Sequence, residues 1–363
     1  MHGLSSSIAI ALCAASALAG HIDVHRGHRI HKRVPRSALA NNSTLDGASS
    51  TENTASAQDG PARLLTFSTT QERSLTSSLL SALFPVSYTS SSSSSFSTCP
   101  SAPNALPLSD ATLRPQAVMS SLSHAYVQSP GANSRLAMRA HYPAGSVALG
   151  HGKPGGISFY APGPASVDWT NAKEVTFGYS VMFGSGFDFN LGGKLPGLYG
   201  GVDANTARSC SGGRRDPSCW STRLMFRQNG QGELYTYIPY SASYPANLAQ
   251  CAQNAHSDCT NAYGASVGRG AFSFVPGEWT QVAMRLRLND AGSANGEIEV
   301  WAAGVSVISA TGLVISPYAG GQRSVFRGIM MQTFFGGHEA QWASPKDQDA
   351  YFADFSVVIT QTF

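Results

Sequence analysis

The sequence predicts an all-β fold, a sandwich of two antiparallel sheets, and three observations predict it. From about residue 111 onward, short runs of alternating apolar and polar residues lie between turns rich in Gly, Pro and Asn. These runs show little of the 3.6-residue periodicity of amphipathic helices. Charged residues make up only 12% of the chain, which argues against long exposed helices held by ion pairs. We therefore expect residues 111–363 to form a concanavalin-like jelly roll.

At least eight segments show the alternation of half-buried strands. One side of each strand should face the core, and the other side should face outward, because successive side chains alternate. The candidate strands are residues 134–142, 174–183, 221–228, 232–240, 279–289, 296–304, 327–335 and 350–359.

The N-terminal third has a different character. Residues 1–20 combine a short apolar stretch with a small-residue Ala-Leu-Ala pattern, which is typical of a secretory signal peptide. A membrane anchor is the alternative, but the apolar stretch is shorter than the ~20 residues that span a bilayer. Residues 21–110 contain the basic pair Lys32 and Arg33 and then a Ser/Thr-rich stretch, so we expect a pro-segment and a disordered linker. The predicted location is extracellular.

Two pairs of cysteines bracket short polar loops in the folded part. Cys210 and Cys219 enclose one loop, and Cys251 and Cys259 enclose the other. Both pairs are expected to form local disulfides, since no CxxC motif or histidine cluster favours the alternative of zinc binding. We predict no cofactor. A structural calcium ion is left open, although no convincing group of carboxylates indicates a site for it.

Charge and hydropathy exclude two classes of partner. The net charge of +3 is too small to indicate nucleic-acid binding. After residue 20, no segment is long and apolar enough to span a membrane. We expect a monomer with neither nucleic acid nor membrane as its partner.

Alternation along two strands places unusual side chains on one surface. In the segment STRLMFR, Arg223 and Arg227 lie on the face opposite the apolar residues, and in ELYTYIP the same holds for Tyr235 and Tyr237. An ordinary solvated surface is the alternative, but paired Arg and Tyr suit an anionic, ring-shaped ligand better. Lys194 is isolated within GGKLPGLYGG. We interpret that segment as a turn whose glycines let a flat ring approach the lysine.

The segments that carry these residues resemble a known family. They look like polysaccharide lyase family 14 and the related glucuronan lyases over roughly residues 115–363. The resemblance implies a jelly-roll enzyme that cleaves acidic polyuronates such as alginate or glucuronan, and an acidic polysaccharide as its partner. It is carried by GGKLPGLYGG together with YPAGS (142–146), CSGG (210–213), STRLMFRQNGQGELYTYIP (221–239) and QTFFGGHEAQWASPKDQDAYF (332–352).

The resemblance also implies which residues act. Lys194 falls on the family's essential lysine, Ser221 and Arg223 fall on a Ser-x-Arg pair, and Tyr235 and Tyr237 fall on a Tyr-x-Tyr pair. We expect Lys194, Arg223 and the two tyrosines to be catalytic, and Ser221 to bind the substrate.

β-Elimination on a uronate explains the need for such residues. The enzyme removes the C5 proton and expels O4, so the carboxylate charge must first be neutralised, which the Arg223 guanidinium can do. Arg227 is expected to hold a neighbouring uronate. Tyr235, Tyr237 and Lys194 are candidates for base and acid, and the sequence does not divide these roles. Clustering is expected to lower the pKa values of the lysine and of both tyrosines.

Further candidates for substrate binding lie outside these two strands. Gln332, His338 and Lys346 fall within the last quoted segment and can bind sugar hydroxyls or carboxylates. Arg139 shares a strand face with His141 and is a further candidate, with bulk solvent as the alternative surrounding.

Two other functions compete with a lyase. A glycoside hydrolase needs two carboxylates about 5 to 9.5 Å apart, and Glu297 with Glu299 is the best pair, although their strand reads as a solvated outer strand. A non-catalytic carbohydrate-binding or lectin domain would keep the aromatic and cationic residues without needing Lys194, Tyr235 and Tyr237.

Overall fold

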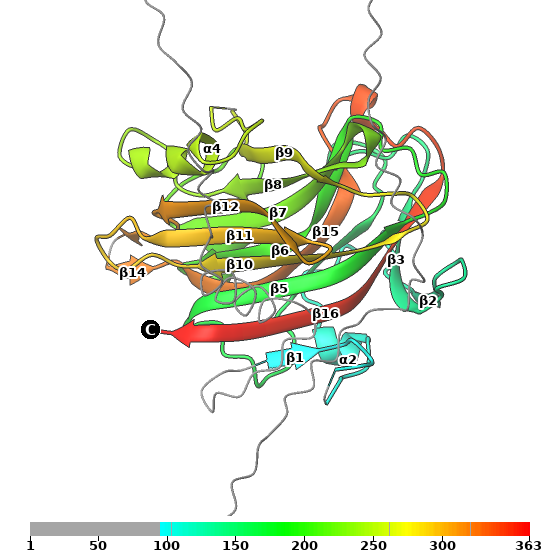
Figure 1. The fold of residues 1–363 in the computed structure, drawn as a ribbon, viewed down its shortest axis with the longest axis horizontal. Helices are drawn as coiled ribbons and strands as arrows, with labels where there is room; N and C mark the ends of the chain where they lie inside the picture. Colours follow the sequence, from blue (N-terminus) through cyan, green and yellow to red (C-terminus); the bar gives the residue numbers. More distant parts are fainter. Residues whose placement is uncertain (1–94, 103, 261, 320) are drawn as a thin grey trace, which may run out of the picture.

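The computed structural model describes residues 95–363 except 103, 261 and 320, and it is a sandwich of two antiparallel sheets (Figure 1). Sheet A has eight strands, in the order β12, β11, β10, β5, β16, β3 and β2, with β1 also paired to β16. Sheet B has six strands, in the order β4, β15, β6, β7, β8 and β9. The predicted all-β sandwich is confirmed.

The elements have the following bounds. Sheet A comprises β1 Ser95–Ser97, β2 Tyr126–Gln128, β3 Leu136–Tyr142, β5 Ala172–Phe183, β10 Trp279–Arg287, β11 Gly296–Ala302, β12 Val305–Leu313 and β16 Gln348–Thr362. Sheet B comprises β4 Ile157–Ala161, β6 Gly192–Gly201, β7 Cys219–Arg227, β8 Gln231–Tyr237, β9 Ala265–Ser273 and β15 Val325–Phe335. The remaining elements are α2 Asp110–Leu113, α3 Ala204–Ala207, α4 Ala249–Ala252, the 3-10 turns η1 Gln228–Gly230, η2 Pro245–Leu248 and η3 Ala340–Trp342, and the pair β13 Tyr318–Ala319 and β14 Gln322–Arg323.

The core fills the space between the two sheets and is rich in aromatic rings. Phe183 of β5 packs edge-on against Phe226 of β7, with ring centroids 5.2 Å apart. Phe226 packs in the same way on Phe335 of β15, also at 5.2 Å. Leu224 and Phe226 are buried here, as the alternation of β7 predicts. Arg223 and Arg227 therefore point from β7 to the opposite side of sheet B.

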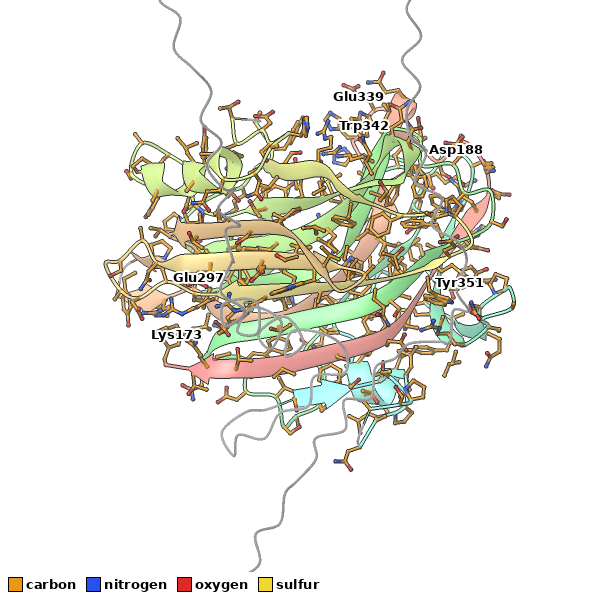
Figure 2. The ribbon with its side chains drawn as sticks, in the orientation of Figure 1. Lys173, Asp188, Glu297, Glu339, Trp342 and Tyr351 are labelled. Carbon is orange, nitrogen blue, oxygen red and sulfur yellow. A yellow bond between two sulfur atoms is a disulfide. The ribbon has the colours of Figure 1, made fainter. Side chains whose placement is uncertain are left out.

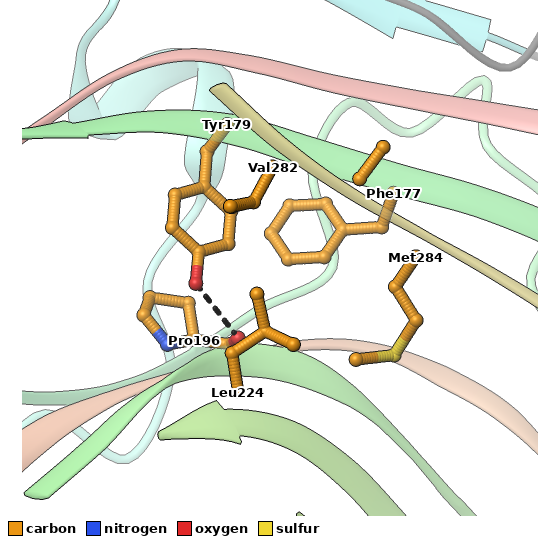
Figure 3. A pocket seen from close by; sticks show the side chains of 7 residues that line it. Phe177, Tyr179, Pro196, Leu224, Val282 and Met284 are labelled. Carbon is orange, nitrogen blue, oxygen red and sulfur yellow. Dashed lines mark hydrogen bonds between the residues drawn. The ribbon is translucent and has the colours of Figure 1, made fainter. Parts of the chain in front are cut away.

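One polar contact crosses this apolar layer (Figure 3). The hydroxyl of Tyr179, on β5, donates a hydrogen bond of 3.3 Å to the carbonyl oxygen of Pro196, on β6. The register of β6 on β7 shifts between Lys194 and Gly197, so this carbonyl belongs to a bulged stretch. The contact gives a buried carbonyl of the bulge a partner from the other sheet.

The segment GGKLPGLYGG is a strand and not the turn we predicted. It forms β6, between β15 and β7, and all ten of its residues are buried. Its glycines serve close packing: an added Cβ would lie 2.3 Å from the Phe226 ring at Gly193, and 1.9 Å from the Thr222 carbonyl oxygen at Gly197. The prediction was wrong because a glycine-rich stretch has the same sequence signature whether the backbone turns or packs tightly against neighbours.

The folded unit begins upstream of the boundary expected at residue 111. β1 pairs with β16, with Ser95 opposite Val358, and Phe96 is part of the main core. The predicted signal peptide, residues 1–20, and most of the predicted linker lie outside the described residues.

Both predicted local disulfides are present. Cys210 is bonded to Cys219, and Cys251 is bonded to Cys259.

In the part of the chain that the structure describes, none of the helices has the length and apolar character needed to cross a membrane.

Candidate active site

A groove of about 1090 Å³ runs over the outward face of sheet B. Its floor comes from β6, β7, β8 and β15, and its walls come from the loops around them. Figure 2 shows two wall residues, Glu339 and Trp342, at one end of the molecule, far from Glu297 of sheet A. The side chains used below that line the groove are Tyr160, Lys194, Arg208, Arg223, Met225, Arg227, Tyr235, Tyr237, Arg269, Gln332, Phe334, His338 and Trp342.

Strand register brings the four predicted catalytic residues together. Arg223 of β7 lies opposite Tyr235 of β8, and the neighbouring pair on the same face is Ser221 with Tyr237. On the other side of β7, Lys194 of β6 lies opposite Met225. Three adjacent strands therefore present one lysine, one arginine and two tyrosines to the same part of the groove.

Lys194 is buried without a carboxylate. Its exposed fraction is 7%, and its Nζ lies 2.9 Å from Met225 Sδ and 3.4 Å from the centroid of the Tyr235 ring. Among the described residues it forms no ion pair. Burial, followed by the charges of Arg223 and Arg227, holds the pKa of Lys194 well below its usual range. This agrees with the lowered lysine pKa predicted from the sequence, and it favours a neutral amine.

The tyrosine pKa values move in the opposite direction from our prediction. Burial raises the pKa of Tyr235 to about 12 and also raises the pKa of Tyr237, although the Arg223 charge partly offsets this. The prediction counted nearby cations but not burial, which the sequence does not show. The hydroxyl of Tyr235 accepts a hydrogen bond of 3.1 Å from the Gly264 amide. Both phenols are therefore proton donors across the neutral range.

Arg223 is the most deeply buried cation of the groove. Only 2% of the residue is exposed, and burial lowers its pKa. Its Nη1 makes one long contact, 3.5 Å, with Gln332 Oε1, and its buried Nε has no hydrogen-bond partner in the described structure. Gln332 in turn donates to Ser158 Oγ at 3.3 Å. A guanidinium held this way has unused donors for an incoming carboxylate.

Arg227 lies one step further along the same face of β7 and is paired. Its Nη2 lies 2.5 Å from Oε1 of Glu233, a carboxylate with no exposed surface. Glu233 is not among the predicted site residues, although its position, two residues before Tyr235, puts it on the groove face.

Three predicted substrate-binding residues are not at the groove. Ser221 is fully buried, and its hydroxyl donates to the Cys210 carbonyl at 2.8 Å, so it anchors the disulfide loop. Arg139 lies on β3 in sheet A, opposite Tyr351. Lys346 donates from Nζ to the Gly186 carbonyl at 2.6 Å. Alternation gives the face of a strand, but it does not reveal which sheet the strand joins or which loop covers it.

His338, for which we predicted a role in substrate binding, lines the groove. Its ring lies 5.4 Å from that of His151 and 5.9 Å from that of Tyr263, measured between centroids. These three rings come from separate loops and form part of one wall.

The sequence reading missed several groove residues. Tyr160 of β4 donates from its hydroxyl to the Arg208 carbonyl at 3.1 Å, and the Arg208 guanidinium lies 5.4 Å from the Tyr160 ring. Trp342 lies 5.9 Å from the Arg227 guanidinium. The alternation of ISFYA was a signal for Tyr160, whereas loop residues such as Arg208 and Trp342 carry no such signal.

The described residues contain one group of potential metal ligands, Cys210, Asp216 and Cys219. The two cysteines form a disulfide, so their sulfurs are not available as thiolates. The expectation that the protein uses no cofactor stays a prediction.

The carboxylate pair of the hydrolase alternative lies in sheet A. Glu297 and Glu299 are on β11, and both contact Arg285 of β10, at 2.7 and 3.9 Å. They serve an ion-pair network outside the groove.

The groove has the parts for one type of chemistry. The Arg223 guanidinium can hold a carboxylate, the Lys194 amine can accept a proton from carbon when it is unprotonated, and the Tyr237 phenol can donate one to a leaving oxygen.

Known proteins are similar to this chain in sequence and in fold. The family model of polysaccharide lyase 14 matches residues 131–355. The marine PL-14 alginate lyase from Aplysia kurodai is 33% identical, with a TM-score of 0.55, over 66% of this chain and 87% of that one. An alginate lyase from a Chlorella virus shares the fold at 20% identity, with a TM-score of 0.50, over 70% of this chain and 94% of that one. No curated protein matches the chain significantly.

Proposed function

The chain belongs to polysaccharide lyase family 14 and is a polysaccharide lyase, and on that premise we propose that it cleaves an acidic polyuronate by β-elimination in the groove of sheet B. The sequence resemblance and the fold agree on the enzyme class. The named activity of the Aplysia kurodai relative makes alginate the first substrate to test, and glucuronan is the second.

The carrying observation is a buried lysine amine beside a buried guanidinium, neither of which has a carboxylate partner among the described residues. Burying an unpaired guanidinium is costly, and a buried lysine avoids that cost by losing its proton, so the two residues together need a functional reason. A uronate carboxylate bound to Arg223 and Gln332 supplies the missing negative charge. Its binding also makes the C5 proton more acidic, because the guanidinium stabilises the charge that develops on the carboxylate.

In the proposed reaction, the neutral Nζ of Lys194 takes the C5 proton. The electrons of the C5–H bond form the C4–C5 double bond, and the C4–O4 bond breaks. The leaving O4 takes the phenolic proton of Tyr237, whose raised pKa keeps that proton in place until it is needed. The ring of Tyr235 packs against the Lys194 amine, with its centroid 3.4 Å from Nζ, and so holds the amine in position.

We also propose that the enzyme is secreted. Two disulfides in the folded part support this, because such bonds persist in oxidising compartments. The predicted signal peptide lies outside the described residues, and the monomeric state stays a prediction.

One assay tests the proposed function. The enzyme is incubated with alginate, glucuronan and a neutral glucan, while the absorbance of the unsaturated uronate and the number of new reducing ends are followed. A lyase gives both signals on a polyuronate and neither on the glucan. New reducing ends without the absorbance would indicate a hydrolase, and binding without either signal would indicate a lectin; both outcomes contradict the proposal.

A further inference from the structure

A second cation is aimed at the groove by an irregular strand. The register of β9 on β8 shifts between Gly232 and Leu234: β8 advances by two residues while β9 passes from Phe272 to Val267. The bulged stretch contains Arg269 between Gly268 and Gly270, with φ values of 65° and 80°. Such positive φ angles favour glycine, and bulges re-aim side chains. Arg269 consequently lines the groove, although simple alternation does not predict its direction.

Arg269 and Arg227 share one carboxylate. Glu233 Oε1 lies 2.5 Å from Arg227 Nη2, and Glu233 Oε2 lies 2.9 Å from Arg269 Nε. Ser266 donates a further hydrogen bond of 2.8 Å to Oε2. The carboxylate has no exposed surface, so it fixes two guanidiniums that come from β7 and β9. We call Arg227, Glu233 and Arg269 the arginine bracket.

The arginine bracket carries more positive than negative charge. It contains two guanidiniums and one carboxylate, which leaves a surplus of one positive charge. Arg227 is 8% exposed, and its buried Nε has no hydrogen-bond partner in the described structure. Nearly half of the Arg269 side chain, 46%, is exposed. Arg269 donates from Nε to Glu233 and from Nη2 to Ser266, so the positive charge that the bracket offers to the groove is mainly that of the exposed Arg269 guanidinium.

The bracket adjoins the reacting centre, because the Arg227 guanidinium lies 5.8 Å from the ring of Tyr235, and Lys194 lies 3.4 Å from the same ring. Arg227 lies four residues beyond Arg223 on β7, about 13 Å along the strand. Trp342 borders it, with the ring 5.9 Å from the Arg227 guanidinium. A chain of uronates bound at Arg223 and extending along β7 would bring another carboxylate and another sugar ring to this place.

We propose that the arginine bracket is a second carboxylate-binding subsite, which holds a uronate other than the one that reacts, with Arg227 and Arg269 as ligands and Glu233 as the residue that positions them. This inference rests on the proposed function. It adds Arg269 and Glu233 to the substrate-binding groups, and it makes productive binding depend on the charge of at least two uronates in the same chain.

The first test compares Arg269→Gln with Arg287→Gln, a matched loss of charge in sheet A, where Arg287 pairs with Asp290. On a polyuronate, Arg269→Gln is expected to raise KM about tenfold, as for the loss of one charge-assisted hydrogen bond, with kcat changed less than about twofold. The increase should shrink with added salt. Arg287→Gln should match the wild type. An unchanged KM in Arg269→Gln, or an equal increase in Arg287→Gln, would overturn the subsite.

Substrate length separates this role from a structural one. The KM penalty of Arg269→Gln should disappear on the shortest uronate oligomer that is still cleaved, because that oligomer does not reach the bracket. Glu233→Gln, which keeps the size of the side chain, should show the same dependence on length. If Glu233→Gln does not fold, the KM values of Arg269→Gln on oligomers of increasing length still test the subsite. A penalty independent of length would contradict the proposal.

Binding distinguishes the failure of this inference from the failure of the proposed function. In a Lys194→Ala background, affinity for a polyuronate is measured by calorimetry with and without Arg269→Gln, and again for the same polymer with its carboxylates reduced to alcohols. Arg269→Gln should weaken binding of the charged polymer only. If the wild type cleaves a polyuronate but Arg269→Gln does not weaken binding of the charged polymer, the subsite is contradicted and the proposed function is not. If the wild type cleaves no polyuronate, the proposed function is contradicted.

Discussion

The outward faces of the two sheets differ in whether their cationic side chains are paired with carboxylates. On sheet A, Arg285 is contacted by Glu174 at 2.8 Å and by Glu297 at 2.7 Å, and Arg135 is paired with the buried Asp354. On sheet B, Lys194 and Arg223 have no carboxylate partner among the described residues, and two arginines share Glu233. Both faces arise from the same alternation of side chains. The charged residues of sheet A balance one another, whereas those of the groove on sheet B do not, and the proposed function depends on this imbalance.

The imbalance has a cost in stability. A buried cation without a partner loses its hydration and gains little in return. The groove face therefore gives up free energy of unfolding in the empty enzyme and recovers it when an anionic sugar binds. Substitutions in the groove should lower activity and leave the fold intact. Substitutions on the outward face of sheet A should leave activity unchanged, whether or not they lower stability.

The largest expected effect is that of Lys194→Met on turnover. Removal of the general base should lower kcat by about 10³-fold. Because an apolar side chain replaces a buried amine, the melting temperature should stay the same or rise. Steady-state kinetics and thermal unfolding check both parts. A fall in both kcat and melting temperature would indicate a structural lysine instead.

Arg223→Lys comes next. It keeps a positive charge but loses the fork that holds a carboxylate through two hydrogen bonds. We expect kcat/KM on a polyuronate to fall about 10²-fold. Arg285→Lys on sheet A is the matched control and should retain wild-type kinetics. Near-normal turnover in Arg223→Lys would show that general positive charge is sufficient and that the fork is not required.

Substitutions of the two tyrosines should differ in their effect on kcat. Tyr237→Phe removes the proposed acid and should lower kcat about 10²-fold. Tyr235→Phe keeps the ring beside Lys194 and loses a hydroxyl that accepts a hydrogen bond from the Gly264 amide and also hydrogen-bonds to Tyr237, so a loss of about tenfold or less is expected. Rate measurements with equal effects in the two variants, or the reverse order, would reassign the acid.

The pH profile sharpens the comparison further. Activity requires neutral Lys194, so the rate should rise with pH through the lowered pKa of that residue. The Arg227 charge lowers this pKa, and the Glu233 charge raises it. Arg227→Gln should therefore move the acid limb of kcat to higher pH, and Glu233→Gln should move it to lower pH. Shifts in the same direction would contradict this electrostatic account.

The smallest expected effect is on sheet A. Glu297→Gln and Glu299→Gln should leave kcat and KM within about twofold of the wild type, and each should cost less than about 1 kcal/mol of stability because these pairs are partly exposed. Loss of activity in either variant would revive a hydrolytic role for this pair.

Local sequence patterns were enough to predict part of this site. Alternation in β7 and β8 placed Arg223, Arg227, Tyr235 and Tyr237 on one face, and register then brought them together. The same rule did not find Arg269, because a bulge re-aims its side chain. Such irregularities depend on contacts between strands that are distant in the sequence.

Other errors share a cause, namely burial. GGKLPGLYGG reads as a turn until the Phe226 ring and the Thr222 carbonyl are seen against Gly193 and Gly197. The tyrosine pKa values were predicted to fall because cations are near, but burial is the larger effect. Ser221 was expected to contact the substrate, but it is buried against the disulfide loop. The sequence shows which groups are present, and packing decides which of them reach solvent.

The central claim is that Lys194 carries a neutral amine in the empty groove at neutral pH. The direct measurement is an NMR titration of the lysine side-chain nitrogen and ε-carbon in labelled enzyme, with the Lys194 signals identified by their absence from Lys194→Met. The account predicts a pKa well below the ordinary value of 10.5. A Lys194 amine that is still protonated at pH 7 would contradict it, because a protonated amine cannot accept the C5 proton.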